Sequence, residues 1–486
     1  MKAIKRSNGL YSISKKQFAK HPKINYSLRD LDIVFIGGVN CASTIKYMQY
    51  TGFHGPMAGF CTRIQAYNEH LYEYLIHGHM KPFKYNATSF SGNYDAEASI
   101  YSNHKIVDIN PKENKVIDDM GNTYSYKALV LNTGLDQAVA NMPFIHKYTQ
   151  DGEFGESRVF VHNPSDTNHL DRNRRIFAMH KDNDFIVYLP EYPSRREAYD
   201  GWYLALDSYL SWGIQSGAHH EKMKIRVITP NKNLYKFKFA NEVVMEECSN
   251  RDLIELHFGW EITDVEIVEK SPNATYRYAT FKNKETGEEM RLQFGTLLLT
   301  PNNKKRTLYE NNDLTNEHGE VTVNPYTLQH TKYPNVFAFG DCANLDTTKS
   351  LYATMNQNAV LRTNLTDFVN GRELKGIYEG YSSFAVNHCI DKQWIFSHRY
   401  NDVPSFGNFY VPRFLGLAAY CVKNELEKQY FTKVFQSKPN YGWPYLVKDK
   451  YFRPIDENKY LKKNNIKREE VLIHPVQPSI VHDHHH

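Results

Sequence analysis

The sequence contains 486 residues, of which 41% are hydrophobic and 23% are charged, and its formal net charge at pH 7 is +5. This composition is that of an ordinary globular protein, and the length predicts about two to four domains whose cores need no disulfide bonds. The positive charge is too small and too widely spread to indicate a nucleic-acid-binding protein. The six cysteines include no CxxC pair. They therefore argue against a zinc or thioredoxin-like site and favour a reducing compartment.

The chain begins with a basic segment. Residues 1–29 contain eight Lys and Arg but no Asp or Glu, and Ser and aromatic residues lie between them. This composition is typical of a mitochondrial targeting segment, and the alternative is a retained basic arm that lies on a partner. No window of eighteen apolar residues occurs, so we expect no membrane-spanning helix. For the C-terminal His-Asp-His-His-His we expect a solvated or partner-docked tail and no metal site.

The first predicted strand is residues 31–38, a buried apolar run that ends in glycine, and residues 42–50 continue it as a helix. This strand–turn–helix passage is typical of the opening of a dinucleotide-binding unit. Later strands are predicted at 56–61, 105–110, 115–117 and 128–131, and a turn is predicted at 119–122, directly after the strand at 115–117. Residues from about 144 to 182 are polar and irregular, and we interpret them as a linker or surface excursion.

A second βαβ unit is predicted after this linker. It consists of a strand at 184–190, a helix at about 198–212 and a strand at 224–229. Further strands are predicted at 257–264, 276–281 and 296–300, and residues 328–341 then return the chain to the first unit. From about residue 371 the pattern is mixed, with a short strand near 394–397 and a helix near 422–436.

Residues 335–357 form the most informative stretch. A short apolar strand runs into Gly340 and Asp341 and then into a predicted helix. In flavoproteins with two dinucleotide-binding domains, such a passage lies against the flavin. Glycine lets the backbone approach the cofactor there, and the carboxylate accepts a hydrogen bond from a ribityl or ribose hydroxyl. The alternative is a fold-determining turn in which Asp341 caps the next helix.

The order of these segments resembles the sulfide:quinone oxidoreductase family, especially its mitochondrial type, over about residues 30–440. Residues 109–134, 326–345, 346–357 and 378–384 carry the resemblance, and the third of these segments keeps Lys349 and Gln357. The resemblance implies an α/β fold with two Rossmann-like dinucleotide-binding domains, the first interrupted by the second, plus a C-terminal α+β region and extended tails.

This resemblance also implies domain boundaries. We expect a basic segment at 1–29, an FAD-type domain at 30–150 and 301–370, an NAD-type domain at 151–300, a C-terminal region at 371–447 and a polar extension at 448–486.

In the family, two cysteines form a redox-active disulfide beside the flavin; sulfide attacks it, and electrons pass through the flavin to quinone. The flanking residues place Arg196 at the first cysteine position and Phe384 at the second. Neither side chain can replace a thiolate in disulfide exchange. Cys389 would take the second position only in a shifted alignment. We expect Cys342, beside the Gly-Asp turn, to be a buried small hydrophobic residue.

The nucleotide loop also departs from the GxGxxG pattern. Gly37 fills the first position and Ala42 is an accepted substitute at the third, but Val39 stands at the second, where a side chain would collide with a phosphate. The adjacent Gly38 leaves a shifted loop as an alternative. Thr62 or Arg63 replaces the acidic residue that binds the adenosine ribose. If FAD is bound, its remnant site would comprise Gly37, Gly38, Asn40, Ala42, Thr133, Gly134, Gly340, Asp341 and Lys349.

Two further features argue against cofactor chemistry. Residues 190–196 fill the turn after the first strand of the second unit with bulk and positive charge, which makes a nicotinamide cofactor unexpected. Leu351, Tyr352 and Met355 replace small residues of the family and fill part of the flavin-ring pocket.

These replacements predict a catalytically degenerate scaffold with no expected cofactor. We interpret it as an accessory or structural subunit of a mitochondrial inner-membrane complex of the respiratory chain. Residues 409–422 are apolar but too short to span a bilayer, and two interpretations stay open for them: peripheral membrane contact and an ordinary core segment. Candidate interface anchors are Trp202, Tyr203, Tyr209 and Trp212, and the alternative is that these residues form a helix face packed on its own sheet. Two alternatives remain open: an active FAD-dependent oxidoreductase that passes electrons to quinone, and a binding module that uses the remnant pocket for a nucleotide or lipid-like ligand.

Overall fold

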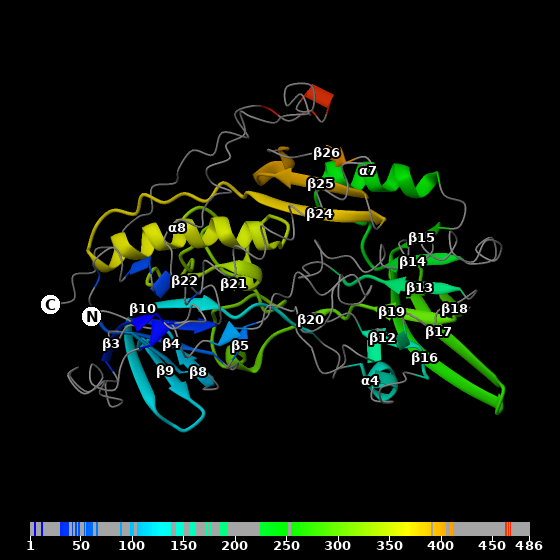
Figure 1. Cartoon of the computed structure of the whole chain (residues 1–486), viewed down its shortest axis with the longest axis horizontal. Helices are drawn as coiled ribbons and strands as arrows, with labels where there is room; N and C mark the ends of the chain where they lie inside the picture. Colours follow the sequence, from blue (N-terminus) through cyan, green and yellow to red (C-terminus); the bar gives the residue numbers. More distant parts are fainter. Residues whose placement is uncertain are drawn as a thin grey trace.

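The computed structural model describes residues 30–37, 105–137, 142–149, 156–161, 184–191, 224–250, 254–389, 392–404 and 409–411, and parts of 4–12, 41–61, 65–101, 172–176 and 462–467. Two sheets lie side by side in Figure 1. Helix α8 (Leu351–Val369) lies over the first sheet, and β24 and β25 reach from it toward α7 (Lys238–Ser249) beside the second.

The first sheet has seven strands in the order β7-β4-β3-β10-β9-β8, and β22 also pairs with β10. Their bounds are β3 (Asp30–Gly37), β4 (Met57–Phe60), β7 (Ala98–Tyr101), β8 (Ile106–Asn110), β9 (Lys115–Asp118), β10 (Thr123–Asn132) and β22 (Val336–Ala338). The strands β7, β4, β3, β10 and β22 run parallel to one another, and residues 33–36 of β3 form a buried apolar run, as is usual for a central parallel strand.

The late strand β22 joins the early strand β10 in this sheet. Leu129 of β10 pairs with Val34 of β3 on one side and with Val336 of β22 on the other. The predicted return of residues 328–341 to the first unit is therefore confirmed. The carboxyl ends of β3, β10 and β22 meet at one edge of the sheet, where Rossmann-like folds bind nucleotides.

The second sheet has five parallel strands in the order β12-β19-β13-β14-β15. They are β12 (Val159–Val161), β13 (Phe185–Tyr188), β14 (Ile225–Thr229), β15 (Ile254–Phe258) and β19 (Thr296–Leu299). One face packs against α7 and the C-terminal strands. The other packs against helix α4 and a three-stranded antiparallel sheet of β16 (Trp260–Ser271), β17 (Ala274–Asn283) and β18 (Glu289–Gln293).

The interpretation of residues 144–182 as a linker or surface excursion is wrong in part. This stretch holds most of helix α4 (Pro143–Thr149) and all of strand β12, which pairs with β19. The buried Arg172 supports both elements, because its guanidinium donates to the carbonyl oxygens of Val159 at 2.8 Å and Tyr148 at 2.9 Å. A three-residue strand is too short to give a periodic signal among polar neighbours.

Two other predictions need correction. The single strand expected at 257–264 is two strands, β15 and β16, separated by Gly259, whose φ of +80° turns the chain from one sheet into the other. Asp341 does not cap the helix that follows. It lies in the 3-10 turn η7 (Gly340–Cys342), and α8 begins later with Ser350 as its N-cap, whose hydroxyl accepts the Ala353 N–H at 3.1 Å.

The C-terminal part forms a small antiparallel sheet of β24 (Ser382–Cys389), β25 (Lys392–His398) and β26 (Phe409–Val411), which confirms the strand predicted near 394–397. The remaining short elements are β1 (Ile4–Lys5), β2 (Tyr11–Ser12), β5 (Gln65–Ala66), β6 (Thr88–Ser89), β11 (Asp136–Gln137), β20 (Asn303–Lys304), β21 (Val321–Thr322), β23 (Ala343–Asn344), η6 (Thr307–Tyr309) and η8 (Tyr400–Asp402). Within the described ranges, no helix is long and apolar enough to cross a bilayer.

Several predictions lie outside the described residues. These are the helices at 198–212 and 422–436, the four aromatic anchors from Trp202 to Trp212, residues 412–422 of the apolar segment, and most of the two tails.

Candidate functional site

A hollow of about 190 Å³, open solvent included, lies at the carboxyl edge of the first sheet beside the Gly-Asp turn. The N-terminus of α8 forms one wall and the loop before it forms another. Ten residues line it: Gly340, Asp341, Ala343, Leu345, Thr347, Lys349, Ser350, Ala353, Thr354 and Gln357. Three residues of the predicted remnant site, Gly340, Asp341 and Lys349, are therefore brought together here.

Lys349 is buried and fully engaged within the chain. Its ammonium lies 2.9 Å from Glu320 Oε2, and each of the two side chains is only 5% exposed. It also donates to the carbonyl oxygens of Asp341 at 2.9 Å and Ala343 at 3.0 Å. A lysine ammonium has three N–H donors, so these acceptors use all of them. Glu320 directly precedes β21 and Ala343 lies in β23. Because Lys349 binds both residues, it reinforces the pairing of β21 with β23.

The Gly340 backbone is equally occupied. Its N–H donates to Gln357 Oε1 at 2.7 Å, Gln357 Nε2 donates to the Tyr378 hydroxyl at 3.2 Å, and that hydroxyl donates to the Tyr381 carbonyl at 2.6 Å. Gly340 has a φ of +78°, and a Cβ there would lie 2.5 Å from Asn132 Nδ2. Packing within the chain thus requires this glycine.

Packing within the chain also explains why position 37 is a glycine. Its φ is +143°, and a Cβ there would lie 2.3 Å from the Asn132 carbonyl oxygen on the neighbouring strand β10. Close approach of two backbones explains this glycine without a phosphate. Thr133 is also engaged, because its hydroxyl lies 2.7 Å from the hydroxyl of the buried Tyr309.

The thiol beside the Gly-Asp turn is buried. Cys342 is 0% exposed, and its Sγ donates to the Phe339 carbonyl at 3.3 Å. Burial raises the pKa of Cys342, and burial raises the pKa of the neighbouring Cys41 thiol well above its usual range. Both therefore stay as neutral thiols at pH 7, which is the inert state of a buried cysteine. The interpretation of Cys342 as a small buried hydrophobic residue is confirmed.

Phe384, at the second family cysteine position, belongs to an aromatic core. It is 4% exposed, its ring stacks on Tyr235 with centroids 6.0 Å apart, and it packs against Phe396 at 5.6 Å. The adjacent ring of Phe237 stacks on His398 at 4.5 Å. These rings join residues 234–239, which precede and begin α7, to strands β24 and β25.

A buried histidine and a pair of charges complete this junction. His398 Nε2 lies 2.9 Å from the Thr348 hydroxyl and Nδ1 lies 3.1 Å from the Arg399 carbonyl, so Nδ1 carries the proton and the Thr348 hydroxyl donates to Nε2. Burial lowers the pKa of His398 to about 4 and keeps it neutral. At the rim, Lys236 binds Asp346 at 2.8 Å. Sequence reasoning missed His398, because a lone histidine at a strand end carries no signal.

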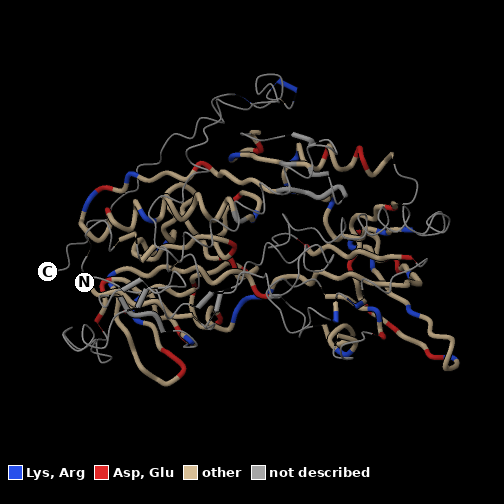
Figure 2. Tube along the Cα trace, viewed as in Figure 1, with Lys and Arg blue, Asp and Glu red and all other residues tan. Residues whose placement is uncertain are grey.

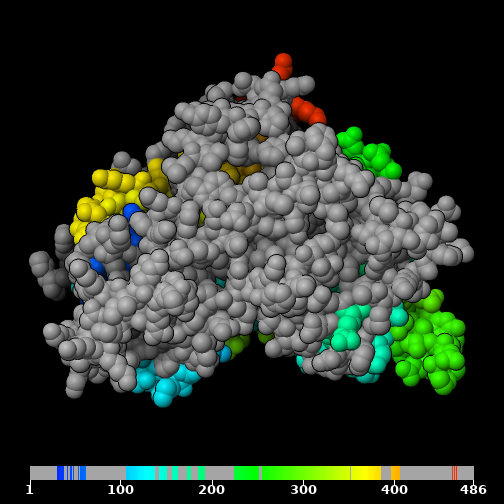
Figure 3. Space-filling view, viewed as in Figure 1, coloured from blue at the N-terminus to red at the C-terminus, as the bar shows by residue number. Residues whose placement is uncertain are grey.

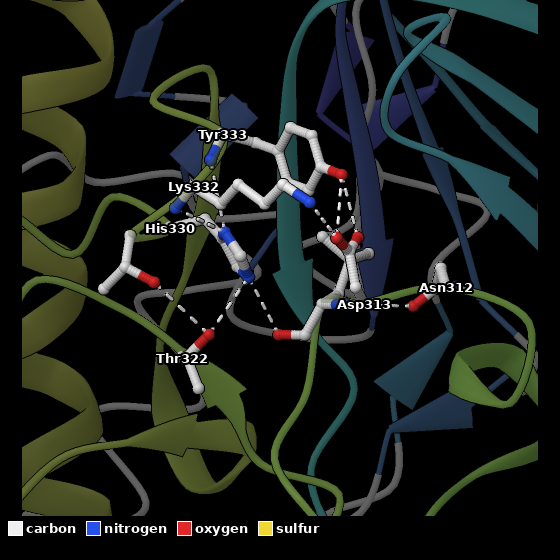
Figure 4. Close-up of polar contacts among 8 residues, drawn as sticks. Asn312, Asp313, Thr322, His330, Lys332 and Tyr333 are labelled. Carbon is white, nitrogen blue, oxygen red and sulfur yellow. Dashed lines mark hydrogen bonds and ion pairs between the residues drawn. The ribbon is translucent and has the colours of Figure 1, made fainter.

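Figure 4 shows why residues 312–333 keep their conformation. His330 Nδ1 accepts the backbone N–H groups of Lys332 at 3.0 Å and Tyr333 at 3.2 Å, and Nε2 donates to the Leu314 carbonyl at 2.9 Å. Burial lowers the pKa of His330, so this neutral imidazole acts as a structural hub. The Tyr333 hydroxyl also donates to Asp313 Oδ1 at 2.8 Å.

Other predicted site residues are not tested. Gly38, Asn40, Ala42 and Arg196 lie outside the described residues, as do Val39, Thr62 and Arg63. Their assignments stay predictions. Gly134 has a φ of +64° in the turn after β10, with no atom within 4 Å of a Cβ built on it. Within the part of the chain that the structure describes, no group of three or more His, Cys, Asp or Glu could hold a metal ion.

Comparison with known proteins places these features in a family context. No family model matches the chain. It is 25% identical over 308 residues to the mitochondrial sulfide:quinone oxidoreductase of Schizosaccharomyces pombe, covering 62% of this chain and 63% of that protein. It is 22% identical to the Mus musculus enzyme, over 57% of this chain and 58% of the other. This chain is a sequence relative of the mitochondrial sulfide:quinone oxidoreductases. The matches span less than two thirds of the length of these relatives.

Solved structures confirm the α/β fold. A chain in the Tetrahymena thermophila mitochondrial ATP synthase matches with a TM-score of 0.73 and 20% identity, over 86% of this chain and 98% of that one. The sulfide:quinone oxidoreductase of Aquifex aeolicus matches with a TM-score of 0.64 and 14% identity, over 86% and 94%. NDH2 from Plasmodium falciparum, solved with NADH, matches with a TM-score of 0.56 and 12% identity, over 85% and 99%. The predicted Rossmann-like architecture is confirmed.

The described residues around the hollow do not fit a flavin ring. A pocket for a drug-sized ligand has a volume of about 300–1,000 Å³, whereas this hollow has essentially no space that a water-sized sphere could occupy. The Lys349 ammonium and the Gly340 N–H, which could bind a cofactor, both donate to groups of the chain itself.

Proposed function

We propose that this protein is a catalytically inactive relative of sulfide:quinone oxidoreductase that serves as an accessory subunit of a large mitochondrial inner-membrane complex. The observation that carries the proposal is the identity and the burial of Phe384. It stands where the family has a redox cysteine, and it is buried in an aromatic core with Tyr235 and Phe396. A phenyl ring forms no disulfide, and its burial leaves no room beside it for a substrate.

The proposal includes the absence of bound FAD. The small hollow and the engagement of Lys349 by Glu320 support it, because a cofactor would have to displace a buried ion pair. Gln357 would also have to release the Gly340 N–H. Each of these groups is satisfied within the chain, and leaving a buried polar group unpaired costs about 1–3 kcal/mol.

Membership of a mitochondrial complex is proposed from the proteins that this chain resembles in structure and in sequence. A chain with this fold over 98% of its length is part of the mitochondrial ATP synthase of Tetrahymena thermophila. The curated relatives are also mitochondrial proteins. These findings support membership of an oxidative-phosphorylation assembly of ATP-synthase or respiratory-chain type. Other protein subunits are then the partners, and the inner membrane is the location.

Two measurements on the protein from its own mitochondria test this proposal. Native gel electrophoresis should place the chain in a complex far larger than its own 56.7 kDa. The purified chain should show no flavin absorbance before or after denaturation. A monomeric yellow protein whose flavin is bleached by sulfide or by a quinol would establish the oxidoreductase alternative. Thermal stabilisation by a nucleotide or a lipid would instead establish the ligand-binding alternative.

A further inference from the structure

The ribbon of β16 and β17 belongs to the three-stranded sheet that packs on the second sheet, and among the described residues no strand pairs with its outer edge, which is strand β16. Figure 1 shows it extending away from the molecule at the lower right, and Figure 3 shows its atoms uncovered on that face. Strand β18 pairs with residues 278–282 of β17, so the outer part of the ribbon has only two strands. Strand β16 is the outermost strand of this sheet.

The free edge includes a regular run. Register shifts occur between Ile262 and Asp264 and between Glu269 and Ser271, and between them each residue from 264 to 269 pairs in sequence with β17. Among the described residues, no backbone hydrogen bond joins residues 264–269 to an element other than β17. In an antiparallel pair, successive residues point their N–H and C=O groups alternately toward the partner strand and away from it, so about three of these six residues present outward groups that can accept another strand.

This edge is acidic although the whole chain is basic. Glu261, Asp264, Glu266 and Glu269 are exposed along β16, and Lys270 is its only cation. Only Glu266 has a cationic partner among the described residues, Arg291 at 2.9 Å. Asp264 and Glu266 are two residues apart and share one face of the ribbon, whereas Glu269 lies on the other face. Figure 2 shows both acidic and basic residues along this arm, and the acidic ones of β16 are those named above.

Side-chain contacts hold the ribbon in shape before any partner binds. Arg291 lies 3.8 Å from the ring centre of Tyr278 while it binds Glu266, and Lys270 lies 5.1 Å from the ring centre of Tyr276. Arg277 donates to the Ser157 carbonyl at 3.1 Å and so fastens the ribbon to the chain before β12. A strand that adds to this edge therefore meets a preorganised template.

We propose that the edge of β16 at residues 264–269 receives a β-strand with Lys or Arg on both faces, contributed by a neighbouring subunit. This inference rests on the proposed function, because it needs an assembly. Carboxylates repel acidic strands and guard the edge against unspecific pairing, whereas a basic strand gains cross-strand pairs with Asp264 and Glu269. The edge thus selects its partner by charge.

Hydrogen exchange on the full chain tests the backbone part of the proposal. We expect the outward-pointing amides among residues 264–269 to exchange at least about tenfold more slowly in the isolated complex than in the free chain. Equal exchange in the two states would overturn the inference. Protection that arises in a purified oligomer of this chain alone would also overturn it, because residues 1–29 of a second copy would then be the basic occupant.

Charge reversal tests the side-chain part. The variant Asp264→Lys/Glu269→Lys should lower the fraction of tagged chain found in the complex about tenfold, since two attractive pairs become repulsive. Glu317→Lys/Glu373→Lys is the matched control, because it reverses two exposed carboxylates outside any strand and should leave that fraction unchanged. Equal incorporation of both variants would contradict the proposal.

The experiments distinguish failure of the proposed function from failure of the proposed strand docking at β16. If the wild-type chain is found in no complex, the proposed function fails and this inference falls with it. If the wild-type chain is in the complex while the edge amides stay unprotected, only the docking inference fails.

Discussion

Removal of the Lys349 ammonium should destabilise the protein far more than removal of an exposed lysine. In Lys349→Met the Glu320 carboxylate stays buried, at 5% side-chain exposure, without its cation. The carbonyls of Asp341 and Ala343 lose their donor as well. Breaking a buried pair on one side costs about 3–5 kcal/mol, a large part of the roughly 5–15 kcal/mol of a folded domain.

A double variant separates the ion pair from simple loss of packing. In Lys349→Met/Glu320→Gln no charge remains buried, so we expect the loss of stability to fall to about 1–2 kcal/mol. The matched control is Lys332→Met. Its ion pair with Asp313 has side chains 58% and 45% exposed, so solvent screens it and its loss should move the unfolding midpoint far less than the loss of Lys349.

Urea unfolding followed by circular dichroism measures these differences as shifts in the transition midpoint. The structural role assigned to Lys349 would be refuted if Lys349→Met unfolded at the same urea concentration as Lys332→Met. It would also be refuted if the double variant were no more stable than Lys349→Met.

Four other predictions follow from the same region. Burial raises the pKa of Asp402 to about 6, so folding loses stability as the pH rises from about 4 to 6; Asp402→Asn should be more stable than wild type at pH 7 by up to about 3 kcal/mol in thermal unfolding. His398, whose pKa is lowered to about 4, gives the opposite slope: it costs stability as the pH falls from about 6.5 to 4, so His398→Gln should resist acid better than wild type. Phe384→Cys should lose about 3 kcal/mol of unfolding free energy through the cavity it creates, and a sulfide-oxidation assay should find no gain of activity. Gly340→Ala should destabilise more than Gly121→Ala in the same urea assay, since both glycines have positive φ but only Gly340 has an atom, Asn132 Nδ2, at 2.5 Å from the new Cβ.

The sequence predicts the parallel strands well because each is a buried apolar run. Strands β3, β10 and β14 fall where the apolar residues are, and the return of residues 328–341 to the first unit is confirmed by β22, although the apolar pattern does not identify β10 as its partner strand. Short elements escape this reasoning. Strand β12 has only three residues. The hydrogen bond that Arg172 donates to its Val159 carbonyl joins two separate segments, and the sequence pattern does not predict such a contact.

The roles of site residues are harder to predict than their positions. The sequence assigns Gly340, Asp341 and Lys349 to one remnant site, and the three residues line one hollow in the structure. It does not reveal that Glu320 would neutralise Lys349, because the two meet only when β21 pairs with β23. It likewise identifies Phe384 as a replaced cysteine, but not the stacking on Tyr235, which depends on the packing of two distant segments.

An experimental density map of the assembled complex at the hollow beside Gly340 tests the central claim most directly. We predict the Lys349 ammonium against the Glu320 carboxylate and the Phe384 ring against Tyr235, with side chains filling the space between them. An isoalloxazine ring in that space, with the Lys349 side chain turned away from Glu320 to meet it, would contradict the account.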